Sequence, residues 1–414
     1  MKYLAAFILL QVFIFNNVNS QAQWVQTSGA VDTNVTQLVV LNSYLFAATT
    51  TGYNNGQIIA STDNGTSWYT AKSGLARVID AFAASGSNLF LSLDDAGVYI
   101  STDYGTTWTQ TNTTVEPYTF SFLTVGSKLY AGTYYQGVYV TADSGASWNQ
   151  LDSGLTNLFV NVLIVSNSNL LAGTEGGGVF LSTNNGTSWT GKSTGIPAGF
   201  GYINAMTSID ANIFAVAYNK GVFRSTNNGT NWTAASTGLP QDGVAFYGIK
   251  ALVSSGNNLF AGTNGGGVYL TTNNGTSWTN VNQGLTPVRI NALVIKDGYL
   301  FAGADSSVWR RPISEMTSVN DKSDDLPVKY SLEQNYPNPF NPGTTIKYAL
   351  PKPAHVTLTI YNSLGQEAAK LLSKDMSAGV YTTEWNASRF ASGVYYYRIV
   401  AGDFVQTKKL ILLK

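Results

Sequence analysis

The chain of 414 residues contains no cysteine and a single histidine, His355. Without cysteine it can form no disulfide, carry no thiolate nucleophile and build no cysteine-ligated zinc site. A Ser–His–Asp or Cys–His catalytic group is excluded from the part of the chain that precedes His355. Charge is scarce as well, because Asp, Glu, Lys and Arg make up 11% of the residues, against about 25% in an average soluble domain.

The 23 basic and 23 acidic side chains cancel. A nucleic-acid binder needs a basic face, so we expect no nucleic-acid partner. What the chain has instead is 41 glycines and a polar content of Ser, Thr and Asn, which is typical of β-structure with many turns. The length allows two or three domains.

Residues 1–20 have the pattern of a signal peptide. Lys2 precedes an apolar run, Tyr3–Phe15, and a polar stretch leads to small residues before a cut after Ser20. A membrane anchor is the alternative, but the run is shorter than the roughly 20 residues that span a bilayer. No later segment is apolar enough to span, so we expect no transmembrane helix.

One octet with the pattern Ser/Thr-x-Asp/Asn-x-Gly-x-x-Trp recurs six times, and its tryptophans are 40 to 46 residues apart. A period in the forties with strand-like content predicts a β-propeller or a solenoid. The third, fifth and eighth positions of the copies are Asp63, Gly65, Trp68, Asp103, Gly105, Trp108, Asp143, Gly145, Trp148, Asn184, Gly186, Trp189, Asn227, Gly229, Trp232, Asn273, Gly275 and Trp278.

Each repeat reads as four short antiparallel strands. Residues 289–310 supply only three strands and no octet, whereas residues 23–27 look like a lone fourth strand with Trp24 in the octet position. Together they make one blade. We therefore predict that residues 21–311 form a seven-bladed propeller closed by the N-terminal strand, which also removes exposed sheet edges.

The octets have two interpretations, calcium binding and turn structure. Half of the copies carry Asn184, Asn227 or Asn273 in place of the acid, which would weaken a divalent site sharply. A turn needs only a short side chain that accepts backbone N–H groups, and Asp and Asn both do so. We favour the structural role and expect neither a metal nor a cofactor.

The octets resemble the Asp-box, or BNR, repeat, and the resemblance covers about residues 24–311. It implies a propeller with the box in the hairpin between the third and fourth strands of a blade. Asp-box propellers include sialidases, xyloglucanases, sortilin-type receptors and photosystem assembly factors, so the resemblance specifies the fold and hardly the activity.

A sialidase-like site, by that resemblance, requires three arginines on the substrate and an Arg-Ile-Pro signature, which is missing. Arg77 and Arg289 precede first strands on the loops that usually form the active face. A hydrolase of neutral glycans needs two carboxylates roughly 5–10 Å apart. The candidates are Asp94, Asp95 and Glu175 on second-to-third-strand loops, and Asp80, Glu116 and Asp242 on loops between blades.

The loops that carry these acids are short, which favours binding over catalysis. Aromatic residues are predicted on the same face, among them Tyr134, Tyr135, Tyr202 and Tyr218. Such rings suit a sugar or a surface protein, with Arg77 and Arg289 as possible contacts. We predict a glycan- or protein-binding module and keep a glycoside hydrolase as the alternative; two arginines are too small a basic patch to support an assembly factor.

Residues 312–329 are polar and without periodicity, as in a linker, and residues 330–414 contain five period-2 strands. The predicted fold is thus all-β, a seven-bladed propeller followed by a small C-terminal β-sandwich. A carbohydrate-binding sandwich is one interpretation of this second domain.

Four segments of the second domain, 335–342, 360–366, 391–398 and 402–409, resemble the type A sorting domain of the type IX secretion system. The resemblance implies transport across the outer membrane of a Bacteroidetes-like bacterium, with the secretion machinery as partner and the secreted or surface-anchored protein as product. The residues that carry the signal are Asn335, Pro337, Pro339, Phe340, Gly365, Gly393, Lys408 and Lys409.

Overall fold

The computed structural model describes residues 23–29, 34–52, 55–111, 118–197, 201–242, 245–246, 248–286, 289–317, 329–376 and 379–413. The chain divides into two compact units, Met1–Ser318 and Val319–Lys414. The predicted signal peptide, residues 1–20, lies outside the described residues. Within the described part, no helix has the length and apolarity needed to cross a membrane.

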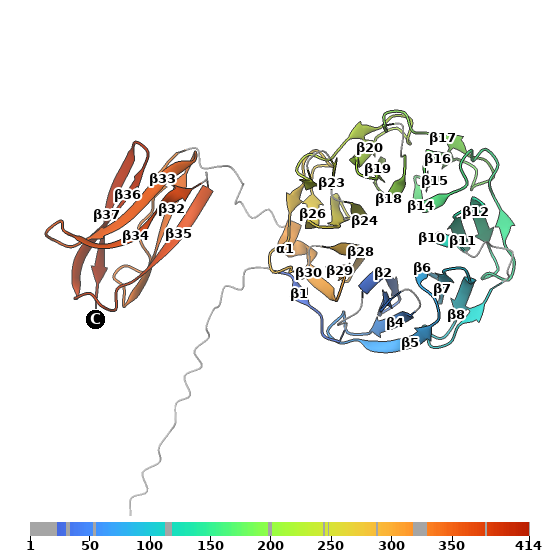
Figure 1. The fold of residues 1–414 in the computed structure, drawn as a ribbon, viewed down its shortest axis with the longest axis horizontal. Helices are drawn as coiled ribbons and strands as arrows, with labels where there is room; N and C mark the ends of the chain where they lie inside the picture. The colour runs from blue at the N-terminus through green and yellow to red at the C-terminus, as the bar shows by residue number, and fades with distance from the viewer. Residues whose placement is uncertain are drawn as a thin grey trace, which may run out of the picture. The chain divides into compact units, whose positions relative to one another are not determined.

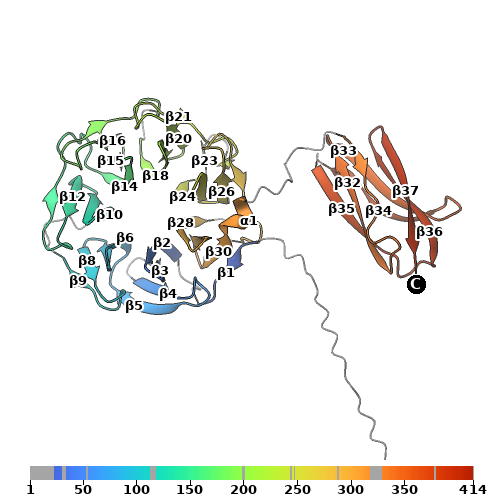
Figure 2. The same ribbon diagram turned by 180° about the vertical axis from the view of Figure 1, so that it is seen from behind.

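The first unit contains seven four-stranded antiparallel sheets among its described residues, arranged as blades around a ring (Figures 1 and 2). The first strand of each blade is innermost and the fourth is outermost. Blade 1 consists of β2 (Asn34–Leu41), β3 (Tyr44–Thr50), β4 (Gly56–Ser61) and β5 (Tyr69–Leu75), and blade 2 consists of β6 (Ile79–Ser85), β7 (Asn88–Leu93), β8 (Gly97–Ser101) and β9 (Thr109–Gln110). Blade 3 consists of β10 (Thr119–Val125), β11 (Lys128–Thr133), β12 (Val138–Thr141) and β13 (Asn149–Gln150). Blade 4 consists of β14 (Val160–Ser166), β15 (Asn169–Thr174), β16 (Gly178–Ser182) and β17 (Thr190–Gly191).

Blades 5 and 6 are built in the same way, and a two-stranded hairpin lies between them. Their strands are β18 (Ile203–Ile209), β19 (Asn212–Ala217), β20 (Gly221–Ser225), β21 (Thr233–Ala234), the hairpin β22 (Gln241–Asp242) and β23 (Ala245–Phe246), and then β24 (Ile249–Ser255), β25 (Asn258–Thr263), β26 (Gly267–Thr271) and β27 (Thr279–Asn280).

Blade 7 is shared between the two ends of the unit, as predicted. Strands β28 (Ile290–Lys296), β29 (Tyr299–Ala304) and β30 (Val308–Pro312) are completed by β1 (Val25–Gln26), which pairs antiparallel with β30. The prediction of seven blades closed by the N-terminal strand is confirmed.

The octet tryptophans join neighbouring blades. The indole N–H of Trp232 in blade 5 donates to Lys192 O of blade 4 at 2.7 Å, and that of Trp278 in blade 6 donates to Ala235 O of blade 5 at 2.7 Å. Trp24 does the same in blade 7, donating to Val281 O of blade 6 at 2.7 Å. Trp68 and Trp189 also donate to the blade before them, so five indoles satisfy their one polar group there. The other two differ, because Trp108 donates to Gly105 O of its own octet and the buried Trp148 Nε1 has no hydrogen-bond partner among the described residues.

The octet itself is a hydrogen-bonded turn. Asp63 Oδ1 accepts the backbone N–H of Ser67 at 2.9 Å, and Oδ2 accepts the Ser67 hydroxyl at 2.6 Å. Asn184 reproduces this pattern, because Oδ1 accepts the N–H of Ser188 and Nδ2 donates to its hydroxyl, both at 2.9 Å. The turn works with either residue, which supports the structural role. Gly65 lies at φ 73°, a conformation that favours glycine.

The boundary after the last blade differs from the prediction. Pro312 ends β30, and the short helix α1 (Ile313–Thr317) follows it. Ile313 is buried in the same apolar cluster as Trp24 and Trp309. These residues, predicted as the start of the linker, therefore belong to the propeller unit because an apolar side chain of α1 packs on blade 7.

The second unit is a sandwich of two sheets. One sheet has the order β31–β32–β35 and the other has the order β34–β33–β36–β37, and their inner faces share one apolar core that includes Phe340, Tyr348 and Trp385. The sandwich is as predicted, with two strands, β31 and β34, beyond the five expected. The strands are β31 (Ser331–Leu332), β32 (Gly343–Leu350), β33 (Ala354–Tyr361), β34 (Glu367–Met376), β35 (Gly379–Asn386), β36 (Gly393–Ala401) and β37 (Phe404–Leu412).

Replacing Trp24 with Ala should destabilise the propeller strongly, because the closing strand loses its buried indole. Trp24 is 2% exposed, whereas its neighbour Val25 is 52% exposed. We expect a loss of about 3–5 kcal/mol in the free energy of unfolding for Trp24→Ala and less than about 0.5 kcal/mol for Val25→Ala. Denaturant titration measures both; equal losses would contradict the closure described above.

Acid stability should depend on the three acidic octets. The hydroxyls of Ser67, Thr107 and Ser147 donate to Asp63, Asp103 and Asp143 and lower the pKa of each carboxyl to about 2. Because these pKa values are lower in the folded state, the stabilisation is present above about pH 4 and is lost as the pH falls towards 2.

The triple variant Asp63→Asn, Asp103→Asn, Asp143→Asn keeps the turns without titrating. We expect its unfolding free energy to fall less between pH 4 and pH 2 than that of the wild type, measured by urea titration at each pH. The variant Asp210→Asn, which alters an exposed aspartate outside the octets, serves as the control. Parallel curves for the triple variant and the wild type would refute this role of the octets.

Candidate functional site

Every innermost strand carries a β-bulge near its start. The register between first and second strands shifts between Ile79 and Ala81 in blade 2, and at the equivalent place in the other blades. A bulge inserts one unpaired residue and re-aims its side chain. The seven inserted residues are Thr36, Asp80, Phe120, Asn161, Asn204, Lys250 and Asn291.

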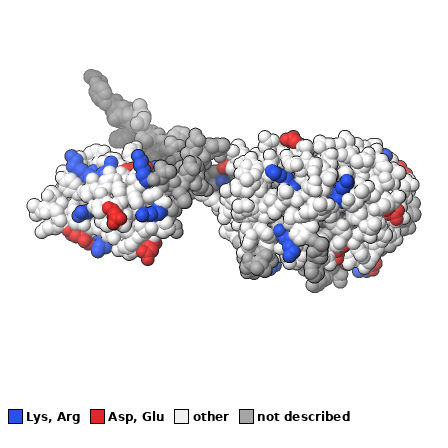
Figure 3. All heavy atoms as spheres, turned by 90° about the horizontal axis from the view of Figure 1, so that it is seen from above, with Lys and Arg blue, Asp and Glu red and all other residues white. Residues whose placement is uncertain are grey.

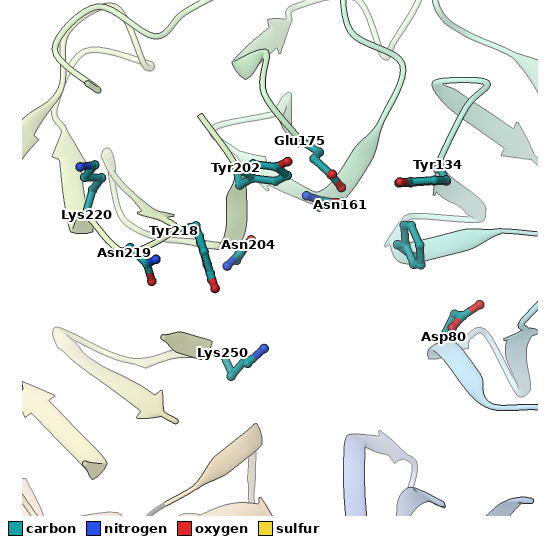
Figure 4. A pocket seen from close by; sticks show the side chains of 11 residues that line it. Asp80, Tyr134, Asn161, Glu175, Tyr202, Asn204, Tyr218, Asn219, Lys220 and Lys250 are labelled. Atoms are coloured by element: carbon teal, nitrogen blue, oxygen red, sulfur yellow. The ribbon is translucent and has the colours of Figure 1, made fainter. Parts of the chain in front are cut away.

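Five of these inserted residues line one pocket, which has a volume of about 1060 Å³. Figure 4 shows their side chains converging from blades 2 to 6. The loops at the same end of the blades supply the remainder of the wall. The lining consists of Asp80, Phe120, Tyr134, Asn161, Glu175, Tyr202, Asn204, Tyr218, Asn219, Lys220 and Lys250.

Main-chain hydrogen bonds fix the loop residues of the pocket. Tyr134 N–H donates to Tyr118 O, Glu175 N–H to Phe159 O, and Tyr218 N–H to Tyr202 O, each at 2.9 Å. In blades 3, 4 and 5 these bonds join the residue that follows the second strand to the residue that precedes the first strand. A bridge between Glu175 and Tyr202 also connects blade 4 with blade 5. The aromatic and acidic side chains of the rim are thus held by backbone pairing and not by long loops.

Aromatic rings form one wall of the pocket. The Tyr134 ring centroid lies 5.3 Å from that of Phe120, 4.3 Å from that of Tyr135 and 4.8 Å from that of Phe159. The Tyr202 and Tyr218 rings are 6.2 Å apart at an interplanar angle of 67°. These are edge-to-face and tilted contacts, so the rings support one another while Tyr218 remains 44% exposed to solvent.

Asp80 is the electrostatically unusual group of the pocket. Burial, together with the negative charge of Asp94, raises the pKa of Asp80 to about 7. Its buried Oδ2 has no hydrogen-bond partner among the described residues. The carboxyl therefore holds a proton more readily than an ordinary aspartate, and the residue belongs to the pocket lining. Lys250, placed by the equivalent bulge of blade 6, lines the opposite side of the same pocket (Figure 4).

The predicted site residues separate into two groups. Glu175, Tyr134, Tyr202 and Tyr218 line the pocket, and Tyr135 contacts the Tyr134 ring. Asp94 and Asp95 are absent from the lining, although Asp94 acts on Asp80 and the negative charge of Asp95 raises the pKa of Tyr118.

The two predicted arginines are not part of the pocket lining either. Arg289 forms an exposed ion pair with Asp305 at 3.8 Å, and Arg77 is exposed in the bend between blades 1 and 2. Glu116 lies outside the described residues. Asp80, predicted on a loop, is instead the inserted residue of β6. In the described part of the chain, no three histidine or acidic side chains gather closely enough to hold a metal ion.

In the second unit, the predicted sorting residues divide between core and surface. Asn335 is buried and its Nδ2 donates to Thr344 Oγ1 at 2.9 Å and to Pro337 O at 3.1 Å. Phe340 packs on Trp385 with ring centroids 5.5 Å apart. Lys408 and Lys409 lie on β37, Gly365 is in the turn after β33, Gly393 begins β36, and Pro339 is an exposed residue beside Phe340.

Residues 334–413 match the family described as the Secretion system C-terminal sorting domain. This tail shows that the protein is exported by type IX secretion to the cell surface. No curated protein matches the chain.

Solved structures share the fold at low sequence identity. PorZ of Porphyromonas gingivalis, a surface component of the type IX secretion system, is 15% identical with a TM-score of 0.54; the match covers 92% of this chain, which spans 60% of PorZ. YCF48 from Cyanidioschyzon merolae is 16% identical (TM-score 0.54, 71% of this chain, 99% of YCF48). The GH74 xyloglucanase from Xanthomonas campestris is 17% identical (TM-score 0.51, 65% of this chain, 50% of the enzyme).

The pKa of Asp80 can be tested directly by carboxyl NMR. We expect a midpoint near pH 7 in the wild type and a lower one in Asp94→Asn, because that variant removes a neighbouring negative charge. Since the pKa of Asp80 is higher in the folded state, the wild type loses stability as the pH rises from about 4 to 7. The variant Asp80→Asn should not show this loss of stability between pH 4 and pH 7. A titration midpoint of Asp80 near pH 4 in the wild type would refute the description of this carboxyl.

Proposed function

For a protein that type IX secretion delivers to the cell surface, we propose that the propeller is a non-catalytic glycan-binding module whose ligand occupies the pocket of blades 2 to 6. The observation that carries the proposal is the lining itself, in which aromatic rings, amides and charged groups converge from separate blades. Convergent polar groups among aromatic walls are typical of ligand sites.

Each part of the lining suits a sugar. The exposed face of Tyr218 offers a flat apolar surface to the C–H face of a pyranose ring. Asn161, Asn204 and Asn219 carry amides that both donate and accept, as sugar hydroxyls also do. A volume of about 1060 Å³ exceeds that of a single sugar site and suits an oligosaccharide. An extended segment of a surface protein is the other occupant that these groups could hold.

A glycoside hydrolase is the second candidate, and Asp80 is the observation that favours it. A carboxyl with a pKa of about 7 can donate a proton to a leaving oxygen at neutral pH. Glu175 lines the same pocket and would be its partner carboxylate. We prefer binding to hydrolysis because the short β-hairpins that frame the pocket would enclose a substrate poorly, whereas hydrolases build longer loops around the scissile bond.

A glycan array probed with the mature chain tests the binding proposal. For a sugar that binds, Tyr218→Ala should weaken the affinity about tenfold, which corresponds to about 1.4 kcal/mol for one lost stacking surface. Tyr69→Ala is the matched control, because Tyr69 is 49% exposed on the outermost strand of blade 1. An array without a hit, or equal losses in the two variants, would overturn the proposal.

The same sugar distinguishes binding from hydrolysis. We expect no cleavage after prolonged incubation with the wild type. Cleavage that disappears in both Asp80→Asn and Glu175→Gln would instead establish the hydrolase.

A further inference from the structure

Three of the four segments that resemble the sorting family meet at a small pocket on the second unit. The pocket has a volume of about 310 Å³. Segment 360–366 contributes four residues, segment 391–398 two and segment 402–409 one. The lining consists of Tyr361, Asn362, Ser363, Gly365, Tyr396, Arg398 and Thr407.

Strand register places Arg398 at the centre of this surface. Arg398 of β36 lies directly opposite Thr359 of β33 on one side and Thr407 of β37 on the other. Tyr361 and Tyr396 are the next cross-strand pair along the same face. Residues in such positions are neighbours on one side of the sheet.

Burial alternates along β36, and this separates the two faces of the strand. Tyr397 and Ile399 are fully buried in the core of the sandwich, whereas Tyr396 and Arg398 are exposed. The Tyr397 hydroxyl donates to Glu333 O at 2.6 Å and accepts the backbone N–H of Asn335 at 2.9 Å, which helps hold segment 335–342. The inward residues of β36 therefore maintain the fold, and its outward residues face solvent.

Arg398 makes no ion pair with any described residue. The acids on the neighbouring edge strand are engaged elsewhere, since Glu367 pairs with Lys370 at 4.0 Å and Asp375 with His355 at 2.8 Å. Residues 330–414 contain nine basic and five acidic side chains. Figure 3 shows Lys and Arg spread over the visible face of this domain, on the left. An anionic partner is thus favoured by both the single guanidinium and its surroundings.

The same outer face exposes apolar side chains. Val394, Val400 and Val405 are 36–48% exposed, and Tyr396 is 39% exposed. The other sheet of the sandwich packs on the opposite face and leaves this one uncovered. Arginine and tyrosine with apolar neighbours on an open face are the composition of a protein-binding surface.

We propose that this outer face of β33, β36 and β37 is the surface through which the sorting domain is read, and that its partner is an acidic peptide segment of the secretion machinery. A carboxylate of that segment binds the Arg398 guanidinium, whose planar donors match a carboxylate in a two-point contact. The hydroxyls of Tyr361, Ser363 and Thr407 surround the contact, and the exposed valines cover the apolar part of the segment.

Export of the full chain from a bacterium with type IX secretion provides the test. Arg398→Glu should lower the exported fraction at least tenfold and leave folded protein in the periplasm. Thr407→Glu is a second variant, because it places a carboxylate of the chain itself opposite Arg398 and occupies the guanidinium. Lys352→Glu is the control, since it removes the same charge from an exposed turn residue outside the pocket.

The outcomes separate recognition from folding and from other partners. Periplasmic accumulation of both Arg398→Glu and Thr407→Glu, with melting temperatures like that of Lys352→Glu, supports the proposal. Normal export of either variant overturns it. Normal export with loss of attachment to the cell surface also overturns it, and assigns Arg398 to a phosphate of the surface lipid instead.

Discussion

The propeller depends on indoles packed between neighbouring blades, and in five of the seven blades the indole N–H also donates to the preceding blade. This bond joins successive blades, as in Trp232 to Lys192 O and Trp278 to Ala235 O. Trp24 makes the same contact from the N-terminal end of the chain, so the step that closes the ring is equivalent to those that build it. A ring of seven similar blades brings seven equivalent strand starts together at its centre, and the bulges of blades 2 to 6 supply five side chains of the pocket.

The chain reaches this architecture with few charges and no disulfide. The octet turns are held by hydrogen bonds to a neutral Asn or a singly charged Asp side chain. Asn184 does in its turn what Asp63 does in another, because one side-chain oxygen that accepts the serine N–H is sufficient. Burial of aliphatic strands and indoles supplies the stability. A few of the charged side chains line the two pockets, as do Asp80 and Lys250 in the propeller and Arg398 on the sorting domain.

The sequence predicts the fold well because the fold is repetitive. Six octets fix the blade period, and the isolated Trp24 reveals the closure. The pocket is harder to predict, because the position of Asp80 depends on a register shift between β6 and β7 that local pattern does not reveal. Arg77 and Arg289 precede first strands, on the loops where the site was predicted, and still are not part of the pocket lining. Aligning the repeats would have helped, since in blades 2 to 7 the inserted residue follows the buried residue that opens the innermost strand, as Asp80 follows Ile79.

The central claim is that the propeller binds its ligand between the bulges of blades 2 to 6. A crystal structure of the mature chain with an oligosaccharide that it binds tests this most directly. The account predicts sugar density in contact with Tyr218 and within hydrogen-bond distance of Asp80 or Glu175. Density on the outer strands of the blades or on the C-terminal sandwich, with this pocket empty, would contradict it.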